Sequence, residues 1–402
     1  MRRLSSLPRT VILVGLAGCQ GVPTAEPPDA GSPEAAASMT ARLLWSRPFG
    51  AEGEVPAALV TAGPDRLLAL TDQAVYRMTL EGRVLSRTPL PAPVRGAGGV
   101  SGLAWDGSGL GLALRWRGDA STKAGTYLAL GDGAGAFAAS DLVPVAGPEA
   151  ALRGAFDGSA HVVVWAAAAE GGLELHELRV ARGAAASERP LASGVEASLA
   201  LGDLLAGPAG VSLCSLEGDG RVELRSFSGE GQSLVAVGSP DRQGIGPCRL
   251  ASSGRSTLVA WRNRALPPRR DGGATTDLGL KALGFDEPVA RVVPAGGALK
   301  GHEPVPLSAQ TGTLRLEATL WDGARYLVLI DAAGVRGGRL FLTVLDETGR
   351  LLARDLPLPV EVEPAVLLTS SLVAGTPDYY LLYGLRRPWD EGVLYLARFS
   401  LY

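Results

Sequence analysis

The chain has 402 residues, with 38 Lys and Arg against 41 Asp and Glu, which gives a net charge of −3. This balance excludes a generally basic nucleic-acid-binding protein and a solvated acidic tail. Apolar residues make up 46% of the chain, enough for a large buried core, and 3 Cys are too few for a scaffold built from disulfides.

The N-terminus has the pattern of a secretion signal. Arginines among residues 2–9 precede the apolar run Val11–Ala17, which is too short to span a bilayer. The run ends in Leu16-Ala17-Gly18-Cys19, which resembles the lipobox of bacterial lipoproteins. This resemblance implies that residues 1–18 are a signal peptide and that the thiol of Cys19 carries the lipid anchor.

Residues 19–40 are predicted to be the lipidated Cys followed by a flexible tether, because they are rich in Pro, Ala and Gly and lack apolar periodicity. In the sorting rule of such lipoproteins an Asp after the Cys retains the protein at the inner membrane. Gln20 therefore resembles an outer-membrane destination. We expect a monomer of the cell envelope that contacts the membrane through its N-terminal lipid and does not bind nucleic acid.

A repeated turn organises the rest of the chain. Aromatic-Asp-Gly triplets centred on Asp106, Asp157 and Asp322 each precede an alternating or β-branched run, and looser turns lie near residues 65, 207, 254 and 377. Asp-Gly and Gly-Pro turns between apolar runs are typical of β-hairpins. Most of the turns are spaced like the blades of a β-propeller, which take about 40–50 residues for four strands.

Each hairpin is followed by a third apolar run, and a fourth is predicted at 82–91, 135–145, 286–295 and 349–359. The seventh unit lacks a fourth run, but residues 41–48 match its pattern. We therefore predict that 41–402 is one all-β domain, a seven-bladed β-propeller whose N-terminal strand closes the last blade. Tandem β-sandwiches are the alternative, since they also contain regularly spaced short strands.

The repeat, of the form DG-x-x-YLV-x-W, resembles the degenerate repeats of secreted bacterial propellers. This resemblance covers residues 41–402 and implies the fold, but it carries no activity.

The sequence offers little catalytic chemistry. The His residues, at 161, 176 and 302, have no ligand-spaced partners, and HExxH, P-loop and G-x-S-x-G motifs are missing. We assign no catalytic residue, metal site or cofactor. Cys214 and Cys248 lie on neighbouring predicted blades, where they form either a disulfide between blades or two buried thiols.

Longer connections at 115–124, 262–277, 331–338 and 386–391 are predicted to share one face, because the tight turns occupy the other. This candidate binding face contains Arg115, Arg117, Lys123, Arg262, Arg264, Arg269, Arg270, Arg386, Arg387 and Trp389. Its basic excess suggests an anionic ligand or acidic partner; the alternative is that these arginines only keep the loops soluble.

The favoured hypothesis is a membrane-anchored envelope lipoprotein whose propeller is a binding or scaffold module for a protein or a glycan. The alternative is a hydrolase or lyase that acts on envelope polysaccharide, which should show convergent carboxylates, His or Tyr at the mouth of the central channel.

Overall fold

A computed structural model describes residues 39–90, 100–116, 123–137, 142–146, 151–208, 210–229, 231–238, 242–264, 286–297, 299, 303–310, 313–334, 337–360, 366–375, 377–386 and 392–402. Within these ranges the regular structure is β-strand and none of the residues is helical, so the described part contains no helix able to cross a membrane. Residues Met39–Tyr402 form a compact unit that contains every strand.

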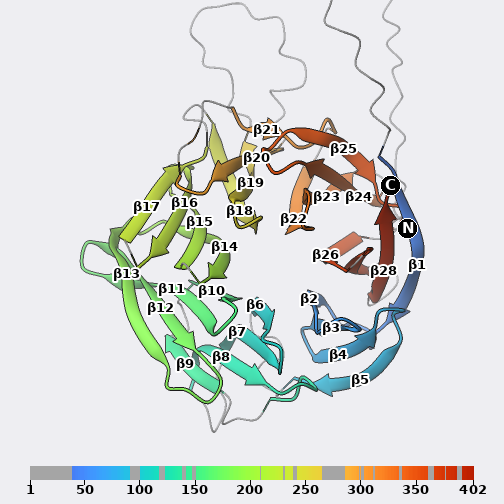
Figure 1. Ribbon diagram of the computed structural model, residues 1–402, viewed down its shortest axis with the longest axis horizontal. Helices are drawn as coiled ribbons and strands as arrows, with labels where there is room; N and C mark the ends of the chain where they lie inside the picture. The colour runs from blue at the N-terminus through green and yellow to red at the C-terminus, as the bar shows by residue number, and fades with distance from the viewer. Residues whose placement is uncertain are drawn as a thin grey trace, which may run out of the picture. The chain divides into compact units, whose positions relative to one another are not determined.

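The strands form seven four-stranded antiparallel sheets that stand around a central axis (Figure 1). Blades 1 to 3 are made of β2 (Pro56–Thr61), β3 (Arg66–Thr71), β4 (Ala74–Thr79) and β5 (Val84–Pro89); β6 (Val100–Trp105), β7 (Leu110–Trp116), β8 (Gly125–Gly131) and β9 (Leu142–Ala146); and β10 (Ala151–Phe156), β11 (His161–Ala169), β12 (Gly172–Val180) and β13 (Ser187–Val195).

Blades 4 to 6 are made of β14 (Ala200–Gly207), β15 (Gly210–Leu216), β16 (Val222–Ser228) and β17 (Gly231–Ala236); β18 (Gln243–Ser252), β19 (Ser256–Arg264), β20 (Asp286–Pro294) and β21 (Val305–Pro306); and β22 (Thr313–Trp321), β23 (Tyr326–Gly334), β24 (Gly337–Leu345) and β25 (Leu351–Pro357). In each of these six blades the chain runs from the innermost strand outward (Figure 1). The fold is a seven-bladed β-propeller, as the repeat predicted, and not a pair of sandwiches.

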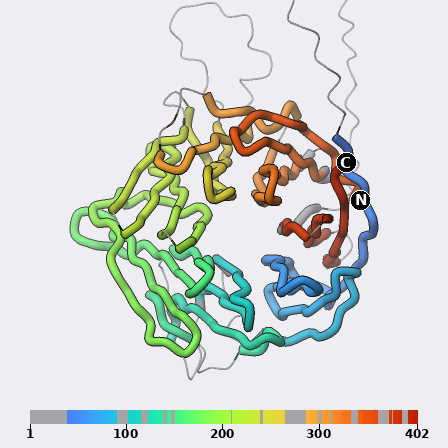
Figure 2. Tube along the Cα trace, viewed as in Figure 1, coloured from blue at the N-terminus to red at the C-terminus, as the bar shows by residue number. Residues whose placement is uncertain are grey.

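The ring closes where its two ends meet in one sheet. Blade 7 has the order β26 (Val366–Ala374), β27 (Tyr379–Arg386), β28 (Val393–Leu401) and β1 (Ala41–Phe49), so the first strand of the chain is its outermost strand. Figure 2 shows the blue N-terminal segment beside the red C-terminal one. Thr40 and Tyr402 exchange backbone hydrogen bonds of 2.9 and 3.0 Å. The predicted closure by 41–48 is confirmed, and it covers the edge of β28 that would otherwise pair with other chains.

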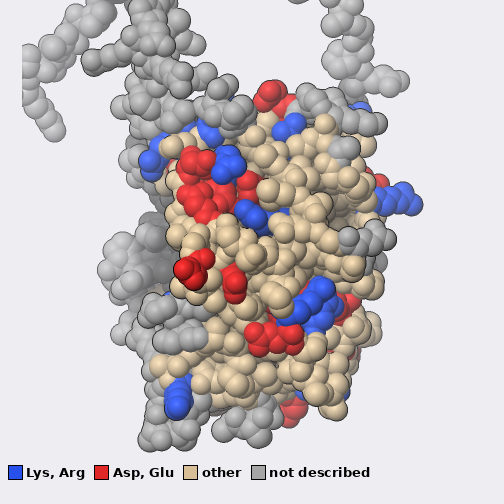
Figure 3. Space-filling view, turned by 90° about the vertical axis from the view of Figure 1, so that its left-hand side faces the viewer, with Lys and Arg blue, Asp and Glu red and all other residues tan. Residues whose placement is uncertain are grey.

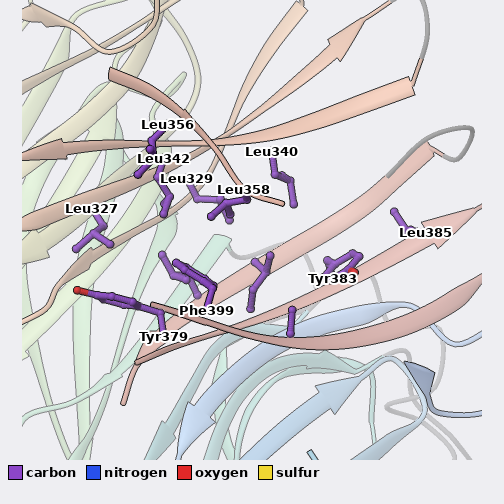
Figure 4. Packing of buried hydrophobic residues seen from close by; sticks show 13 residues of the cluster. Leu327, Leu329, Leu340, Leu342, Leu356, Leu358, Tyr379, Tyr383, Leu385 and Phe399 are labelled. Carbon is purple, nitrogen blue, oxygen red and sulfur yellow. The ribbon is translucent and has the colours of Figure 1, made fainter. Parts of the chain in front are cut away.

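The core consists of apolar layers between neighbouring blades. Because side chains alternate along a strand, β23 sends Leu327 and Leu329 toward blade 7 and Val328 and Ile330 toward blade 5. Figure 4 shows the layer between blades 6 and 7, where Leu327, Leu342 and Leu356 pack near Tyr379 and Phe399. Every blade is therefore buried on both faces, which explains the long apolar runs in the sequence.

Two predictions about local structure are wrong. The run 286–295, expected to be the fourth strand of its blade, is the third strand, β20, and the fourth strand is only Val305–Pro306. Pro304 and Pro306 have no N–H to donate, so this strand stays short. The expected third run, 278–285, lies outside the described residues. The predicted loop 331–338 is mostly strand as well, since β23 and β24 pair as far as Gly334 and Gly337.

The tight turns between first and second strands bind the next blade. The carboxylate of Asp106 accepts the N–H groups of Ser108 and Gly109 through Oδ1, and its Oδ2 lies 3.0 Å from Nε2 of His161, the first residue of β11. In the same way, the Tyr379 hydroxyl at the start of β27 donates to Oδ2 of Asp322 at 2.5 Å. We call these contacts inter-blade latches, and the face of the ring that carries the turns the turn face.

A third latch replaces the aspartate by serine. The hydroxyl of Tyr326, the first residue of β23, donates to the backbone oxygen of Ser256 at 2.7 Å. Ser256 lies next to the turn of blade 5, where the Ser253 hydroxyl accepts the Ser256 N–H. The first position of the second strand therefore has a repeated role: a His or Tyr there reaches back to the previous blade.

A disulfide joins blades 4 and 5 in the structure. Cys214 on β15 and Cys248 on β18 have their Cα atoms 6.1 Å apart, and both side chains are buried. A Cβ at Gly202 would collide with both sulfur atoms, so a glycine is needed beside this bond.

Candidate functional site

The predicted binding face corresponds to the end of the ring where second strands end, which we call the loop face. There the structure separates the basic residues. Arg115 and Lys123 belong to blade 2, whereas Arg262 and Arg264 end β19 in blade 5, so they do not form one basic sector. Three of these four residues lie on strands and not in loops, since Arg115 belongs to β7 and Arg262 and Arg264 belong to β19. Arg262 also forms an ion pair of 2.9 Å with Asp286.

Of the other members of the predicted face, Arg386 ends β27 in blade 7. Outside the described residues lie Arg117, Arg269, Arg270, Arg387 and Trp389. On the outer side of the ring near β13 and β17, Figure 3 shows acidic and basic atoms in mixed groups separated by uncharged surface. The described surface on that side therefore offers no broad patch of one sign.

A row of charged side chains crosses the innermost strands instead. Arg153 on β10 donates from Nη1 and Nη2 to the backbone oxygens of Leu152 and Leu201, at 2.8 and 2.6 Å. Asp203 on β14 accepts from Nη1 of Arg249 on β18 at 3.1 Å. Burial lowers the pKa of Arg153, although the negative charge of Asp203 opposes this. Hydrogen bonds from Arg153 to β14 and the ion pair between Asp203 and Arg249 thus link the innermost strands of blades 3, 4 and 5.

The row continues on blade 6. Arg315 on β22 binds the Asp331 carboxylate at 2.6 Å and lies 3.3 Å from Glu317. Burial raises the pKa of Asp331, and the hydrogen bond from Arg315 lowers it by less. We call Arg153, Asp203, Arg249, Arg315 and Glu317 the channel row. Its exposed members are accessible to ligand, because 29% of the Asp203 side chain, 31% of Arg249 and 37% of Arg315 are exposed.

β-Bulges place the acidic members of this row. The pairing of β14 with β15 breaks between Leu201 and Leu204, and that of β22 with β23 breaks between Leu316 and Ala318. Asp203 and Glu317 lie within these breaks. A bulge leaves a residue unpaired and redirects its side chain, which brings polar groups to strands that otherwise carry apolar residues.

A cleft of about 450 Å³ opens at the loop face between blades 4 and 5. Its walls include Ser198, Glu217, Gln243 and Arg264, so one residue of the predicted binding face does line a cavity. Glu217 accepts a hydrogen bond of 2.7 Å from Nη2 of Arg225. Burial raises the pKa of Glu217 more than this contact lowers it. Burial thus favours the uncharged form of this carboxyl at the wall of the cleft, and the ion pair with Arg225 favours the charged form.

The histidines have structural surroundings in the described residues. His161 belongs to an inter-blade latch, and burial lowers its pKa more than Asp106 raises it. The His176 ring stacks on Trp165, with ring centroids 5.1 Å apart. His302 lies outside the described part. No group of three potential metal ligands occurs among the residues that the structure describes.

Reasoning from sequence missed the channel row. Its residues stand singly in apolar strands, and no motif joins them. The available signal was one charged residue near the middle of predicted first strands, at Arg153, Asp203, Arg249 and Arg315. A residue of this kind in a strand with two buried faces must have a polar partner or reach solvent at the channel.

Comparison with known proteins identifies the fold alone. No family model matches the chain, and no curated protein matches it. Among solved structures it is similar to an ulvan lyase of the polysaccharide lyase family PL25: TM-score 0.55, 10% identity, with 87% of this chain and 95% of that chain covered. The same type of lyase bound to -[GlcA(1-4)Rha3S]- gives a TM-score of 0.54 with 11% identity, covering 87% and 95% of the two chains.

A prolyl endopeptidase is also similar, with a TM-score of 0.49, 13% identity and 87% of this chain covered. The match covers 50% of that chain, so the present sequence spans about half the length of this peptidase.

Proposed function

We propose that this protein is a lipid-anchored binding module of the cell envelope, held at the outer membrane, whose channel row and adjoining cleft bind an acidic glycan or an acidic protein segment. The observation that carries the proposal is the set of partly exposed arginines on the innermost strands of blades 3, 5 and 6, Arg153, Arg249 and Arg315. Arg249 and Arg315 are fixed by carboxylates and Arg153 by backbone oxygens, and guanidinium groups match the geometry of carboxylate and sulfate groups on a ligand.

The direction of the chain supports this arrangement. Ala41 pairs with Leu401, and Phe399 pairs with Tyr379, which is the residue of the turn-face latch. The chain from the proposed anchor therefore joins the ring at the turn face. The cleft beside Arg264 opens at the opposite end, where a partner can reach it.

The binding test uses residues 39–402, which include every strand, on an array of neutral and acidic glycans, with a pull-down from envelope extract beside it. We expect acidic ligands to be retained and Arg249→Ala to weaken their binding at least tenfold. Arg255→Ala is the matched control, because its side chain is 87% exposed on the turn face. Equal loss in both variants, or no preference for acidic ligands, would contradict the proposal.

A polysaccharide hydrolase or lyase is the second candidate. It is supported by the raised pKa of Glu217 at the cleft and by the similarity in fold to a polysaccharide lyase. The test is incubation with acidic polysaccharides, followed by assays for new reducing ends and for the ultraviolet absorbance of unsaturated products. Activity that Glu217→Gln abolishes would support an enzyme, whereas binding without turnover supports the module.

The anchor is tested separately in the full chain. Replacing Cys19 by Ala should move the protein from the membrane fraction to the soluble fraction, because the thiol that takes the lipid is lost. A Cys19→Ala protein that stays in the membrane fraction would remove the anchor from the proposal.

A further inference from the structure

The outermost strands of three adjacent blades expose a leucine at the same place. Leu352 on β25 is 37% exposed, Leu44 on β1 is 39% exposed and Leu85 on β5 is 45% exposed. These strands belong to blades 6, 7 and 1, which follow one another around the rim (Figure 1). The leucines therefore lie on one sector of the outer wall, with β1 in the middle.

Each of these leucines is the extra residue of a β-bulge. Its neighbours on both sides pair with the next strand, and the leucine does not: Leu43 and Trp45 pair with β28, Val84 and Ser86 with β4, and Leu351 and Ala353 with β24. In a regularly paired strand, successive side chains point to opposite faces of the sheet. A bulge interrupts this alternation and redirects the side chain of the extra residue, which here is exposed to solvent. Three independent strands thus use the same device to expose an apolar residue.

Arginines accompany every leucine. Each strand or the turn before it carries two of them, and all six side chains belong to exposed residues: Arg83 and Arg87, Arg42 and Arg47, Arg350 and Arg354. Arg87 pairs with Glu54, and Arg350 pairs with Asp346. The other carboxylates of these strands and turns are Glu81, which is exposed, and Glu347 and Asp355, which are partly buried. The basic residues outnumber the acidic ones on this sector, which we call the arginine-leucine wall.

The wall is continuous across the ring closure. A Cβ on Gly82, in the turn before β5, would lie 2.6 Å from the Trp45 ring on β1, so the two strands meet with no space between them. Among the described residues, Leu234 on β17 is an exposed leucine on a different part of the rim and has regular pairing. On β13, Leu191 is also the extra residue of a bulge but is partly buried against the core, so a bulge alone does not expose a leucine, and the exposed ones at bulges among the described residues lie on this sector.

We propose that the arginine-leucine wall docks on the surface of a membrane that contains anionic phospholipid. This inference rests on the proposed lipid anchor. The chain after Cys19 reaches Met39 in about 20 residues and then enters β1, the middle strand of the wall. A flexible tether of this length would have a mean span of about 25 Å, long enough for the wall to reach the membrane from the proposed anchor.

The chemistry of the wall fits that occupant. Arginine side chains interact with lipid phosphates while their aliphatic stems and nearby leucines enter the region between headgroups and acyl chains. With the wall on the membrane, the propeller axis lies along the membrane plane, and neither end of the channel is covered by lipid.

The test measures co-sedimentation of residues 39–402, which lack Cys19, with vesicles of phosphatidylcholine alone or with added phosphatidylglycerol at low ionic strength. We expect binding that needs phosphatidylglycerol and weakens as salt is added. The triple variant Arg42→Glu, Arg83→Glu, Arg354→Glu should lose at least tenfold in affinity, and so should Leu44→Ser, Leu85→Ser, Leu352→Ser.

The control is Leu234→Ser, which removes an exposed leucine from a different strand and should bind like the unchanged domain. Absence of vesicle binding at low salt, or equal binding by the wall variants, would overturn the docking proposal. Failure of the anchor is seen in the Cys19→Ala fractionation instead, since the domain used for sedimentation has no anchor. Circular dichroism of each variant checks that lost binding is not lost folding.

Discussion

The junction between blades 6 and 7 and the junction between blades 4 and 5 are held by different interactions. Between blades 6 and 7, an apolar layer is topped at the turn face by the latch from Tyr379 to Asp322. Between blades 4 and 5, the described turn residues Gly207, Pro208 and Gly210 have no side chain able to accept a hydrogen bond, and a disulfide joins the blades.

The difference follows from what each junction contains. The junction of blades 6 and 7 is packed with leucine and aromatic side chains, and the hydrogen bond from Tyr379 to Asp322 adds one polar contact to this packing. The junction of blades 4 and 5 opens at the loop face into a cleft lined by the buried carboxyl of Glu217. A covalent bond there keeps two blades together beside a cavity that costs packing energy. Clefts of about 690 and 350 Å³ also lie between blades 5 and 6 and between blades 3 and 4, so room for a ligand is not confined to the covalently held junction.

The largest expected effect concerns the disulfide. Changing both Cys214 and Cys248 to Ala releases a constraint on a sequence separation of 34 residues. For a loop of that size the loss in the free energy of unfolding is about 3–4 kcal/mol. Urea unfolding of the oxidised domain and of the double variant measures it. A loss below about 1 kcal/mol, on the scale of an ordinary surface substitution, would mean that packing alone holds this junction.

The latch is expected to contribute less. In Asp322→Ala the N–H groups of Ala324 and Arg325 and the hydroxyl of Tyr379 all lose their acceptor, which should cost about 2–3 kcal/mol. Tyr379→Phe removes one of these bonds and should cost about 1 kcal/mol. Equal losses in the two variants would show that the Tyr379 hydroxyl accounts for the whole effect and that the turn itself contributes nothing.

Acid should affect the two junctions in opposite directions. Burial raises the pKa of Asp322, but hydrogen bonds from Tyr379 and the turn outweigh it, so the pKa is lowered in the folded protein. This group stabilises the fold above its unfolded pKa of about 4, and that stability is lost as the pH falls. Burial raises the pKa of Glu217, so its contribution is fully present below its unfolded pKa of about 4.3 and is lost as the pH rises above that value.

Unfolding measured from pH 3 to pH 7 separates these contributions. Asp322→Asn should flatten the loss of stability on acidification, and Glu217→Gln should make it steeper. If Glu217→Gln instead flattened the dependence of the free energy of unfolding on pH, the folded protein would stabilise the charged form of Glu217. This result would contradict a pKa raised by burial.

The features of these junctions that could be predicted from the sequence are encoded by a few adjacent residues or by a repeated pattern. The turns at Asp106, Asp157 and Asp322 were found because a hairpin turn is encoded within a few residues. The closing strand was found because 41–48 repeats the pattern of two other outer strands. The role of Tyr379 as a latch was not found, because its partner belongs to another blade, 57 residues earlier in the chain.

The errors have the same physical origin. The outer strand of blade 5 was misplaced because strand order depends on pairing partners, and an insertion had shifted the count. The channel row was missed because bulges, which arise from the pairing of β14 and β22 with their neighbours, place Asp203 and Glu317. Arg115 and Arg262 were grouped on one sector because a repeat shows that two loops share a face but not how far apart they lie around the ring.

The variant with the smallest expected effect on stability, Arg249→Ala, is also the most direct test of whether the channel row binds a ligand. Arg249→Ala removes an ion pair with Asp203 in which both side chains are about 30% exposed, 31% and 29%. Such pairs contribute at most about 1 kcal/mol, because solvent screens them, so the free energy of unfolding should fall far less than in the disulfide variant. Binding of an acidic ligand should nevertheless fall at least tenfold, since Asp203 is then left without its partner and repels the ligand. Unfolding and binding measured on the same preparation decide the matter: a large loss of stability with unchanged binding would make the channel row a structural feature like the latches.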